Sequence, residues 1–256
     1  MLRPPPSIPL RLLHYWWPVV MGWSLSVVVQ RATGRAFNPT GLALLLCGIA
    51  AVYSLDRIED VRAAPARWMA PLLLAVGALA SALCLGLAWQ LPWRTAFLLP
   101  APALLVAGYP FVKRWPGTKT IVVAAVWTWS AVALPFAGAV GAWEALQVPV
   151  ALPIFLLVAA GCVLCDLKDI ERDRAARVGS LPALMGSQAS ITVAVVLAAA
   201  GVVAASAQHR PGLAIGGVCL ALAGGRPALL GSAAIGPLVV DAILTLPGAL
   251  IAARLV

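Results

Sequence analysis

Long apolar runs follow one another along the whole chain and are separated by short polar segments. Each run is roughly as long as a helix must be to cross the hydrocarbon core of a bilayer, about 20 residues. The approximate bounds of the nine runs are 13–29, 39–55, 69–89, 96–112, 121–141, 148–164, 188–207, 212–225 and 232–252. The eighth run is the weakest, because two glycines and an Arg-Pro pair interrupt it at 224–227. The pattern predicts an all-α polytopic membrane protein with about nine transmembrane helices. No linker or low-complexity stretch divides the chain, so we expect a single membrane domain over residues 1–256.

Composition supports a membrane location and narrows the function. Only 11% of the residues are charged and 62% are hydrophobic, with a mean hydropathy of +0.97. Such a chain cannot cover a soluble core with polar groups, so it must use lipid as its outer surface. The net charge of +9 comes from 18 lysines and arginines in short segments between apolar runs, where they orient helices and meet anionic lipid headgroups. Nucleic-acid binding is therefore not expected.

The cysteines indicate apolar packing rather than chemistry. The five are Cys47, Cys84, Cys162, Cys165 and Cys219, and all lie inside or at the ends of apolar runs, without the spacing of a disulfide framework or a zinc site. The N-terminal segment has no small-residue cleavage site after an apolar stretch, so we interpret the first run as a retained helix.

The positive charges predict the orientation in the membrane. With nine spans, the N-terminus and the loops after the second, fourth, sixth and eighth spans lie on one side, and these segments hold 13 of the 18 lysines and arginines. The positive-inside rule places that side in the cytoplasm. We therefore expect a multi-pass protein of a bacterial inner membrane with these loops in the cytoplasm.

Acidic residues are scarce, and seven of the nine fall in two short segments on the expected cytoplasmic side. The segments are YSLDRIEDVR at 53–62 and CDLKDIERDR at 165–174, and the seven acids are Asp56, Glu59, Asp60, Asp166, Asp169, Glu171 and Asp173. Oxygen ligands without His or Cys at matching spacing favour Mg²⁺, which completes its shell with water and substrate phosphates. The alternative is a solvated loop whose acids pair with neighbouring arginines. Two such segments, holding most of the acid in the chain, favour the bound cation.

The spacing within the two segments is alike. Asp56 and Asp60 are four residues apart, as are Asp169 and Asp173, and each pair follows an apolar run. On a helix this spacing puts both carboxylates on one face, and Asp166 joins the second pair from three residues earlier. We therefore expect three carboxylates on a single stripe in the second segment and interpret the two segments as a weak internal duplication.

The second acidic segment resembles a known sequence motif. The run DLKDIERDR at 166–174, followed by Ser180-Leu-Pro182 and then Gly186, resembles the second aspartate-rich motif of the UbiA-type superfamily of intramembrane prenyltransferases. That motif is DxxDxxxD with a trailing Thr/Ser-Leu-Pro and a glycine, and the match is highly specific.

Two further segments extend the resemblance over essentially the whole chain. The first acidic segment is similar to the family's first motif, NxxxDxxxD, except that Val52 stands in place of Asn and Tyr53 in place of a frequent Asp. The segment YPFVKRW at 109–115 resembles the YPxxKR segment of the 4-hydroxybenzoate prenyltransferase branch. The first motif is therefore degenerate, which puts one metal site in question, and the last two runs carry no motif.

The resemblance implies a bundle of nine helices around a central cavity that opens sideways to lipid, with the two acidic segments facing each other at its cytoplasmic mouth. It implies that an isoprenyl diphosphate binds there through two Mg²⁺ ions, whose expected ligands are Asp56, Asp60, Asp166, Asp169 and Asp173. Positive charge can stabilise the departing diphosphate, and the expected residues for this are Arg57, Lys113, Arg114, Lys119 and Lys168. Of the aromatic residues near the mouth, we expect Tyr109 and Tyr53 in the cavity, and we interpret most of the tryptophans as interfacial anchors.

Three functions are compatible with these features. The first is Mg²⁺-dependent transfer of an isoprenyl group from a prenyl diphosphate to a lipophilic acceptor within the membrane. The second is a terpene cyclase on the same scaffold, which ionises the diphosphate and uses no acceptor. The third is a non-catalytic membrane protein whose carboxylates bind a cation. The family resemblance favours the transferase.

Asp241 is the one acid expected in the interior of a span, in GPLVVDAILTLPG at 236–248. An ionisable group at membrane depth is costly and calls for a partner, and Thr245, one turn further on, and Arg226 are candidates. We favour a structural role for this carboxyl. The second interpretation is a base that takes a proton from an acceptor or from a cyclised cation.

Overall fold

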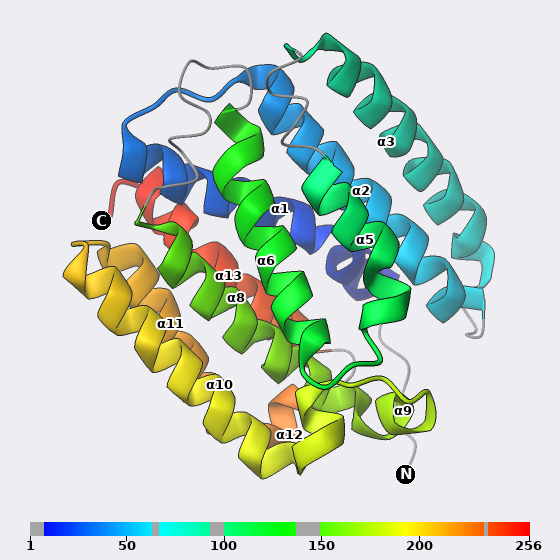
Figure 1. The fold of residues 1–256 in the computed structure, drawn as a ribbon, viewed down its shortest axis with the longest axis vertical. Helices are drawn as coiled ribbons and strands as arrows, with labels where there is room; N and C mark the ends of the chain where they lie inside the picture. The colour runs from blue at the N-terminus through cyan, green and yellow to red at the C-terminus, as the bar shows by residue number, and fades with distance from the viewer. Residues whose placement is uncertain (1–7, 63–66, 93–99, 137–148, 233–234) are drawn as a thin grey trace.

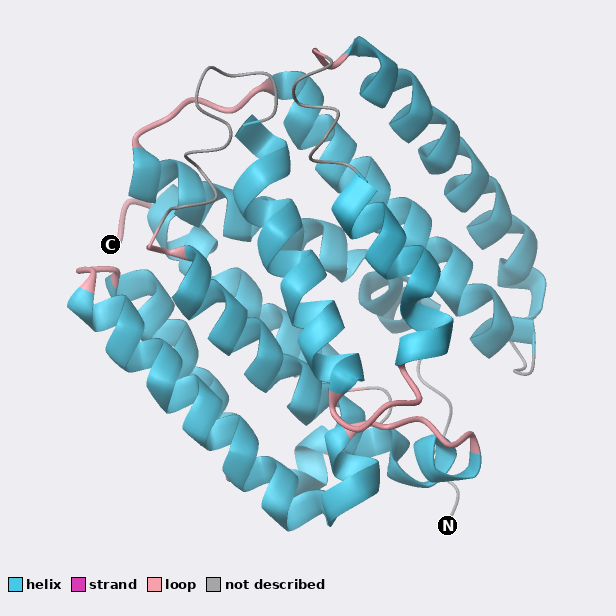
Figure 2. Cartoon of the chain, in the orientation of Figure 1, coloured by secondary structure: helices cyan, strands magenta, loops and turns pink. Residues whose placement is uncertain are grey.

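The computed structural model describes residues 8–62, 67–92, 100–136, 149–232 and 235–256 of the chain. Within these ranges the chain forms helices and no strands (Figure 2). The long helices are α1 (Ile8–Thr33), α2 (Pro39–Arg62), α3 (Ala70–Gln90), α5 (Pro100–Val112), α6 (Thr118–Ala133), α8 (Ala151–Asp166), α10 (Leu181–Ala207), α11 (Pro211–Gly224) and α13 (Gly236–Ala252). Shorter elements are the 3₁₀ turns η1 (Arg67–Met69), η2 (Leu134–Phe136) and η3 (Leu167–Asp169) and the helices α9 (Ile170–Ala175) and α12 (Pro227–Leu230).

The nine long helices in the described ranges correspond one to one with the nine expected runs, which confirms the all-α membrane fold. In the described residues, five segments are long and apolar enough to cross a membrane, and the apolar helices Pro211–Gly224 and Gly236–Ala252 are shorter. Several helices extend beyond the apolar runs. Helix α2, for example, continues to Arg62 and so includes the first acidic segment. An apolar run marks only the part of a helix that lies in lipid, whereas backbone hydrogen bonding continues past it.

The outer surface of the bundle is apolar, as a lipid environment requires. Helix α3 lies at the edge of the bundle beside α2 (Figure 1). It exposes large hydrophobic side chains along its length, among them Leu79, Leu85 and Trp89, the last with 92% of its surface accessible. A soluble protein would pay a large hydration penalty for such a surface, whereas hydrocarbon solvates it.

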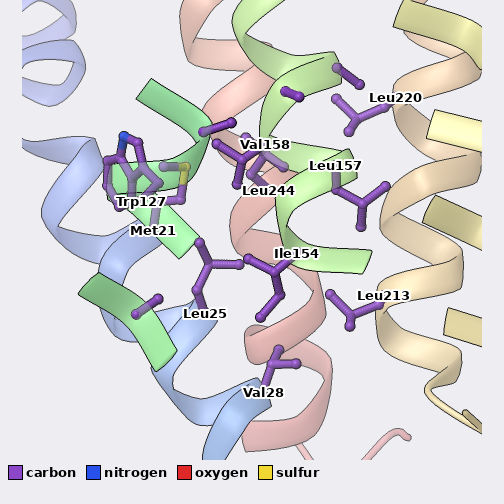
Figure 3. Close-up of a cluster of buried hydrophobic side chains, with 14 of the residues drawn as sticks. Met21, Leu25, Val28, Trp127, Ile154, Leu157, Val158, Leu213, Leu220 and Leu244 are labelled. Atoms are coloured by element: carbon purple, nitrogen blue, oxygen red, sulfur yellow. The ribbon is translucent and has the colours of Figure 1, made fainter. Parts of the chain in front are cut away.

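The core lies between α1, α6, α8, α11 and α13. Met21 and Leu25 of α1, Trp127 of α6, Ile154 of α8 and Leu244 of α13 belong to one buried cluster (Figure 3). Small residues let these helices approach closely. A side chain at Gly161 of α8, for instance, would place its Cβ 2.9 Å from Leu244 Cδ1. Close packing through glycine is the usual way in which helices associate in lipid.

Helices α1 and α13 are joined by polar contacts at a proline. Pro247 lies inside α13 and interrupts its hydrogen-bond ladder. The buried Ser24 hydroxyl of α1 bonds the backbone on both sides of this proline: its Oγ donates to the Thr245 carbonyl oxygen at 2.6 Å and accepts from the Gly248 N–H at 3.0 Å. Trp17 Nε1 also donates to Thr245 Oγ1 at 3.1 Å. These contacts join α1 to the backbone of α13 around Pro247, where the helix lacks a hydrogen bond of its own.

One end of the bundle gathers the segments with motif residues. The end of α5, the start of α6 and the short helices α9 and α12 all lie at this end (Figure 1). The connection between α1 and α2 and the C-terminus lie at the opposite end (Figure 1). The positions of these segments agree with the sides that the nine-span pattern assigns to them.

Candidate functional site

The second aspartate-rich segment does not continue α8 as a straight helix. Helix α8 ends at Asp166, a 3₁₀ turn follows, and α9 begins at Ile170. Asp169 has φ −105° and ψ 8°, outside the helical region, and this residue bends the chain between the two helices. The three aspartates therefore lie on different elements, and the expectation of one continuous stripe does not hold for them.

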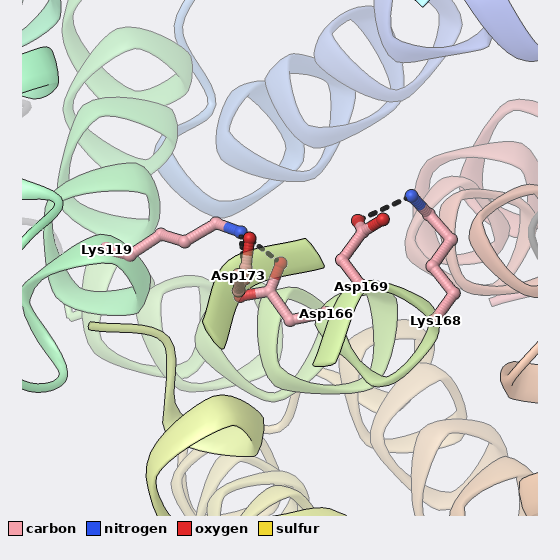
Figure 4. A network of polar contacts seen from close by, with 5 residues as sticks. All are labelled: Lys119, Asp166, Lys168, Asp169 and Asp173. Atoms are coloured by element: carbon pink, nitrogen blue, oxygen red, sulfur yellow. Dashed lines mark hydrogen bonds and ion pairs between the residues drawn. The ribbon is translucent and has the colours of Figure 1, made fainter. Parts of the chain in front are cut away.

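Lys119 connects two of these aspartates. Its Nζ lies 2.8 Å from Asp166 Oδ1 and 3.1 Å from Asp173 Oδ2 (Figure 4). All three side chains are largely withdrawn from solvent, with side-chain accessibilities of 17%, 10% and 8%. Buried carboxylates are tolerated only when a cation or several hydrogen bonds compensate them, and here the ammonium group of α6 does so.

The third aspartate has a partner of its own. Lys168 Nζ donates to Asp169 Oδ2 at 2.6 Å, and this pair is separate from the Lys119 group and lies to its right in Figure 4. The remaining acid of the segment, Glu171, pairs with Arg174 at 3.0 Å, and its side chain is 87% accessible. The interpretation of a solvated loop whose acids pair with arginines thus fits Glu171. It does not fit Asp166 and Asp173, which are buried and pair with a lysine from another helix.

Two loops hold Lys119 in place through backbone hydrogen bonds. The Gly117 N–H donates to the Gly179 carbonyl oxygen, and the Gly179 N–H donates to the Lys113 carbonyl oxygen, both at 2.8 Å. Gly117 has φ +72°, which a glycine adopts without strain, and α6 begins directly after it. The loop before α6 and the loop after α9 are therefore attached to each other, and this attachment places Lys119 beside the aspartates.

Gly179→Ala should separate these loops, because a Cβ at this position would overlap the Trp115 carbonyl group. We expect a loss of stability of about 2 kcal/mol, since backbone atoms cannot move aside as a flexible side chain can. Thermal unfolding in detergent would measure it. Gly108→Ala is the matched control, because nothing lies within 4 Å of a Cβ there, and it should unfold as the wild type does. Equal melting temperatures for all three proteins would contradict the loop attachment.

Tyr109 lies between the two acidic segments. Lys113 Nζ lies 5.9 Å from the centroid of the Tyr109 ring, so the two side chains form a cation–π contact. Tyr109 is in α5, and Lys113 is in the turn that follows it. The Tyr109 hydroxyl is within electrostatic range of Asp56 on α2 and of Asp166 and Lys119. The placement of Tyr109 thus links the first segment to the second.

The other expected site residues are not part of the group formed by Lys119, Asp166 and Asp173. Asp56 is exposed on α2, and Asp60 lies in the same helix with its side chain outside the described part of the structure. Arg114 is exposed in the turn after α5. Arg57 is partly buried and is within electrostatic range of Tyr53, which packs edge-on against Trp127 at 6.1 Å between ring centroids. Tyr53 and Arg57 are four residues apart and so share one face of α2.

Asp241 has a different environment from the one expected. The Thr245 hydroxyl donates to the backbone carbonyl of Asp241 at 2.8 Å rather than to its carboxyl group. The charged group that acts on the Asp241 carboxyl is Arg57 of α2, and Tyr53 is within range of it as well. Sequence spacing gave no sign of this relation, because the helices α2 and α13 are far apart in the chain and share no motif.

Asp241→Asn should leave diphosphate release and product formation within about twofold of wild type, because the amide keeps the shape of the side chain and an acceptor oxygen for Arg57 and removes only the base. Both quantities would be measured in membranes with a prenyl diphosphate labelled in both halves. Loss of the transferred product while diphosphate is still released would instead assign Asp241 as the base that acts after ionisation.

An apolar pocket of about 180 Å³ opens between α6 and α8. Its lining includes Thr128, Trp129 and Phe155 and none of the charged residues described above. This pocket is therefore separate from the lysine–aspartate group, and it offers an apolar surface rather than a reactive centre.

The aspartates offer one oxygen that suits a divalent cation. Asp166 Oδ2 is buried and has no hydrogen-bond partner among the described residues, so it presents a free oxygen of the kind that Mg²⁺ prefers. Among these residues no group of three or more acids, histidines or cysteines could enclose a metal ion. Mg²⁺ is commonly bound by one or two carboxylates plus water and substrate phosphates. The site therefore fits a cation that is shared with a phosphate ligand.

Fold and site together define a polytopic α-helical membrane protein with a buried lysine–aspartate group at one end of the bundle. Residues 66–222 match the UbiA prenyltransferase family, and since this is more than half of the sequence, the chain belongs to that family. The matched range contains the second aspartate-rich segment and the segment from Tyr109 to Trp115. It begins after the first acidic segment and ends before α13.

A solved structure shares the fold. The apo structure of a UbiA homologue from Aeropyrum pernix K1 is similar to this chain with a TM-score of 0.68 at 18% sequence identity, and the match covers 93% of this chain and 98% of the homologue. The similarity extends over more of the chain than residues 66–222 of the family match. No curated protein matches the chain.

Proposed function

We propose that this protein transfers an isoprenyl group from a prenyl diphosphate to a lipophilic acceptor within the membrane. The observation that carries the proposal is the Lys119–Asp166–Asp173 group, which lies at the end of the bundle beside Tyr109 and Lys113. Membership of the UbiA prenyltransferase family supports the reaction type. The apolar helices around this group supply a path for a prenyl chain that stays in lipid.

The reaction needs a site that accepts negative charge. The allylic C–O bond breaks, and its electron pair leaves with the diphosphate. The acceptor then forms a bond to the allylic carbon and gives up a proton. Lysine ammonium groups near the departing oxygens lower the energy of the charge that develops there. Lys113, Lys119 and Lys168 are the cations that support this role, and Arg57 and Arg114 extend the positive surface at the same end of the bundle.

The acids have a complementary role in the proposal. A divalent cation such as Mg²⁺, when bound, supplies further neutralisation of the diphosphate charge. The free Oδ2 of Asp166 supports this residue as one ligand. Asp169 and Asp173 are proposed from the same segment, and Asp56 and Asp60 from the first segment. Tyr109, near both segments, would orient the diphosphate between them.

The proposal is tested with membranes that contain the protein, supplied with geranyl, farnesyl and geranylgeranyl diphosphates labelled in the prenyl group and in the β-phosphate. A labelled lipid that forms only when a membrane lipid extract is added supports the transferase. A labelled hydrocarbon without added extract would identify a cyclase instead. If no diphosphate is released beyond the level of membranes without the protein, the non-catalytic function is correct.

We infer that the site faces the cytoplasm, because 13 of the 18 lysines and arginines lie on the side that holds it. In whole cells, a membrane-impermeant thiol reagent should label Arg35→Cys and should label Arg174→Cys only after lysis. The native cysteines would first be replaced by alanine or serine. The reverse labelling pattern would place the site outside the cell.

A further inference from the structure

Lys119 occupies the position where two carboxylates of the second segment meet. Its ammonium contacts Asp166 Oδ1 at 2.8 Å and Asp173 Oδ2 at 3.1 Å. Both aspartates are buried, with relative accessibilities of 7% and 6%. Two buried carboxylates this close to one point would repel each other strongly without a cation between them. The Lys119 ammonium thus neutralises the two carboxylates at a place where a bound metal ion would otherwise do so.

The ammonium is not a loosely placed side chain. Lys119 lies in the first turn of α6, directly after the loop that is bonded to Gly179 through backbone groups. A metal ion that took both contacted oxygens would have to displace an ammonium that is fixed by two loops. For a metal ion, displacing the Lys119 ammonium is therefore less favourable than binding to a carboxylate oxygen that has no partner.

The net charge of the aspartates and their lysine partners also favours a single divalent cation. Asp166, Asp169 and Asp173 carry three negative charges, and the contacting Lys119 and Lys168 carry two positive charges, so the group retains one negative charge (−3 + 2 = −1). The buried oxygen that remains without a partner in the described residues is Asp166 Oδ2. Within the second segment, one net negative charge and one free buried oxygen suit one shared divalent ion rather than two.

We propose that the Lys119 ammonium permanently replaces one of the two divalent cations that the family resemblance implies, so that the protein binds a diphosphate with a single divalent cation. This inference rests on the proposed function, because it describes how the same site binds a diphosphate. It also accounts for the degenerate first segment, in which Val52 and Tyr53 stand where the resemblance implies Asn and Asp. With one cation supplied by the chain, fewer metal ligands are needed.

The number of bound metal ions tests the inference directly. Purified protein in detergent would be dialysed to equilibrium against radioactive Mn²⁺ with saturating inorganic pyrophosphate, and the bound ions would be counted per chain. We expect one Mn²⁺ per chain for the wild type. Two ions per chain would overturn the inference without any variant.

Variants at Lys119 give the second part of the test. Lys119→Met removes the ammonium and should raise the count from one to two. Lys119→Arg keeps the charge and should leave the count at one. Arg174→Met is the matched control, because it removes an equal charge from an exposed pair with Glu171, and its count should stay at one. Equal counts in the wild type and Lys119→Met would contradict the inference. Lys119→Gln, which keeps a hydrogen-bond donor, provides the same comparison should the methionine variant not fold.

A parallel assay separates this inference from the proposed function. Release of labelled diphosphate from geranyl, farnesyl and geranylgeranyl diphosphates would be measured on the same wild-type preparation, with a membrane lipid extract added to supply the acceptor. If diphosphate is released and Lys119→Met binds no additional ion, the proposed function stands and the role of Lys119 is wrong. If no diphosphate is released but the counts differ as expected, the cation role of Lys119 stands and the transferase proposal is wrong.

Discussion

Asp166→Ala should lower diphosphate release at least about a thousandfold, while the protein keeps its helical circular dichroism spectrum. Asp166 is the residue that combines a contact to Lys119 with a free buried oxygen in the described part of the site. Its removal deletes a proposed metal ligand and leaves Lys119 to pair with Asp173 alone. Release of ³²P-labelled diphosphate from membranes would measure the effect, and we expect Asp169→Ala and Asp173→Ala to be impaired as well.

Glu171→Ala is the control for this prediction. It removes an acid from the same segment, but the Glu171 side chain is 87% accessible and contacts Arg174 only at the surface. Exposed ion pairs contribute little, so release should remain within about twofold of the wild type. Normal turnover in all three aspartate variants would rule out the enzymatic function of this site.

Gly248→Ala should destabilise the protein by about 3 kcal/mol. A Cβ at this position would overlap the backbone and the hydroxyl of Ser24, which is completely buried. The substitution would push α1 and α13 apart at the point where Ser24 satisfies the backbone around Pro247. Thermal unfolding followed by circular dichroism in detergent would show the lower melting temperature.

Gly86→Ala provides the comparison. Gly86 is also a helix glycine, but it is exposed on α3, and nothing lies within 4 Å of a Cβ there. Alanine has the higher helix propensity, so this variant should be as stable as the wild type or slightly more stable. If Gly248→Ala were equally stable, the close contact between α1 and α13 would not exist in the folded protein.

The helical fold could be predicted from the sequence because the hydrophobicity that places a segment in lipid is determined by the residues of that segment alone. Each run that is long enough to span the bilayer must satisfy its backbone within itself, so its position in the chain already determines its structure. The ends of the helices could not be obtained in this way. Helix α10, for example, begins at Leu181, although the apolar run was placed at 188–207. Its first two turns hold Pro182 and a non-helical Gly186 with φ +81° and ψ 172°, and hydropathy does not predict this kink.

The candidate site could be predicted only in part. Motif residues were found because they are adjacent in sequence, and Lys119 was expected near the diphosphate because of its charge and position after the fourth run. Its contact with Asp166 and Asp173 depends on the attachment between two loops more than 50 residues apart, and no periodicity encodes that. The separate pairing of Asp169 with Lys168 follows from the 3₁₀ turn after α8, which helical spacing does not predict.

The attachment between the loops around Gly117 and Gly179 is made by main-chain atoms, so it does not depend on the identity of most side chains in either loop. Exposed positions such as Trp115 and Ala176 can therefore vary widely through evolution or in engineered libraries while the alignment of Lys119 is kept. The two loops form a surface whose chemistry can change independently of the lysine–aspartate group beneath it. Diversifying this surface is thus a route to new soluble partners or altered regulation that leaves the chemistry of the buried group untouched.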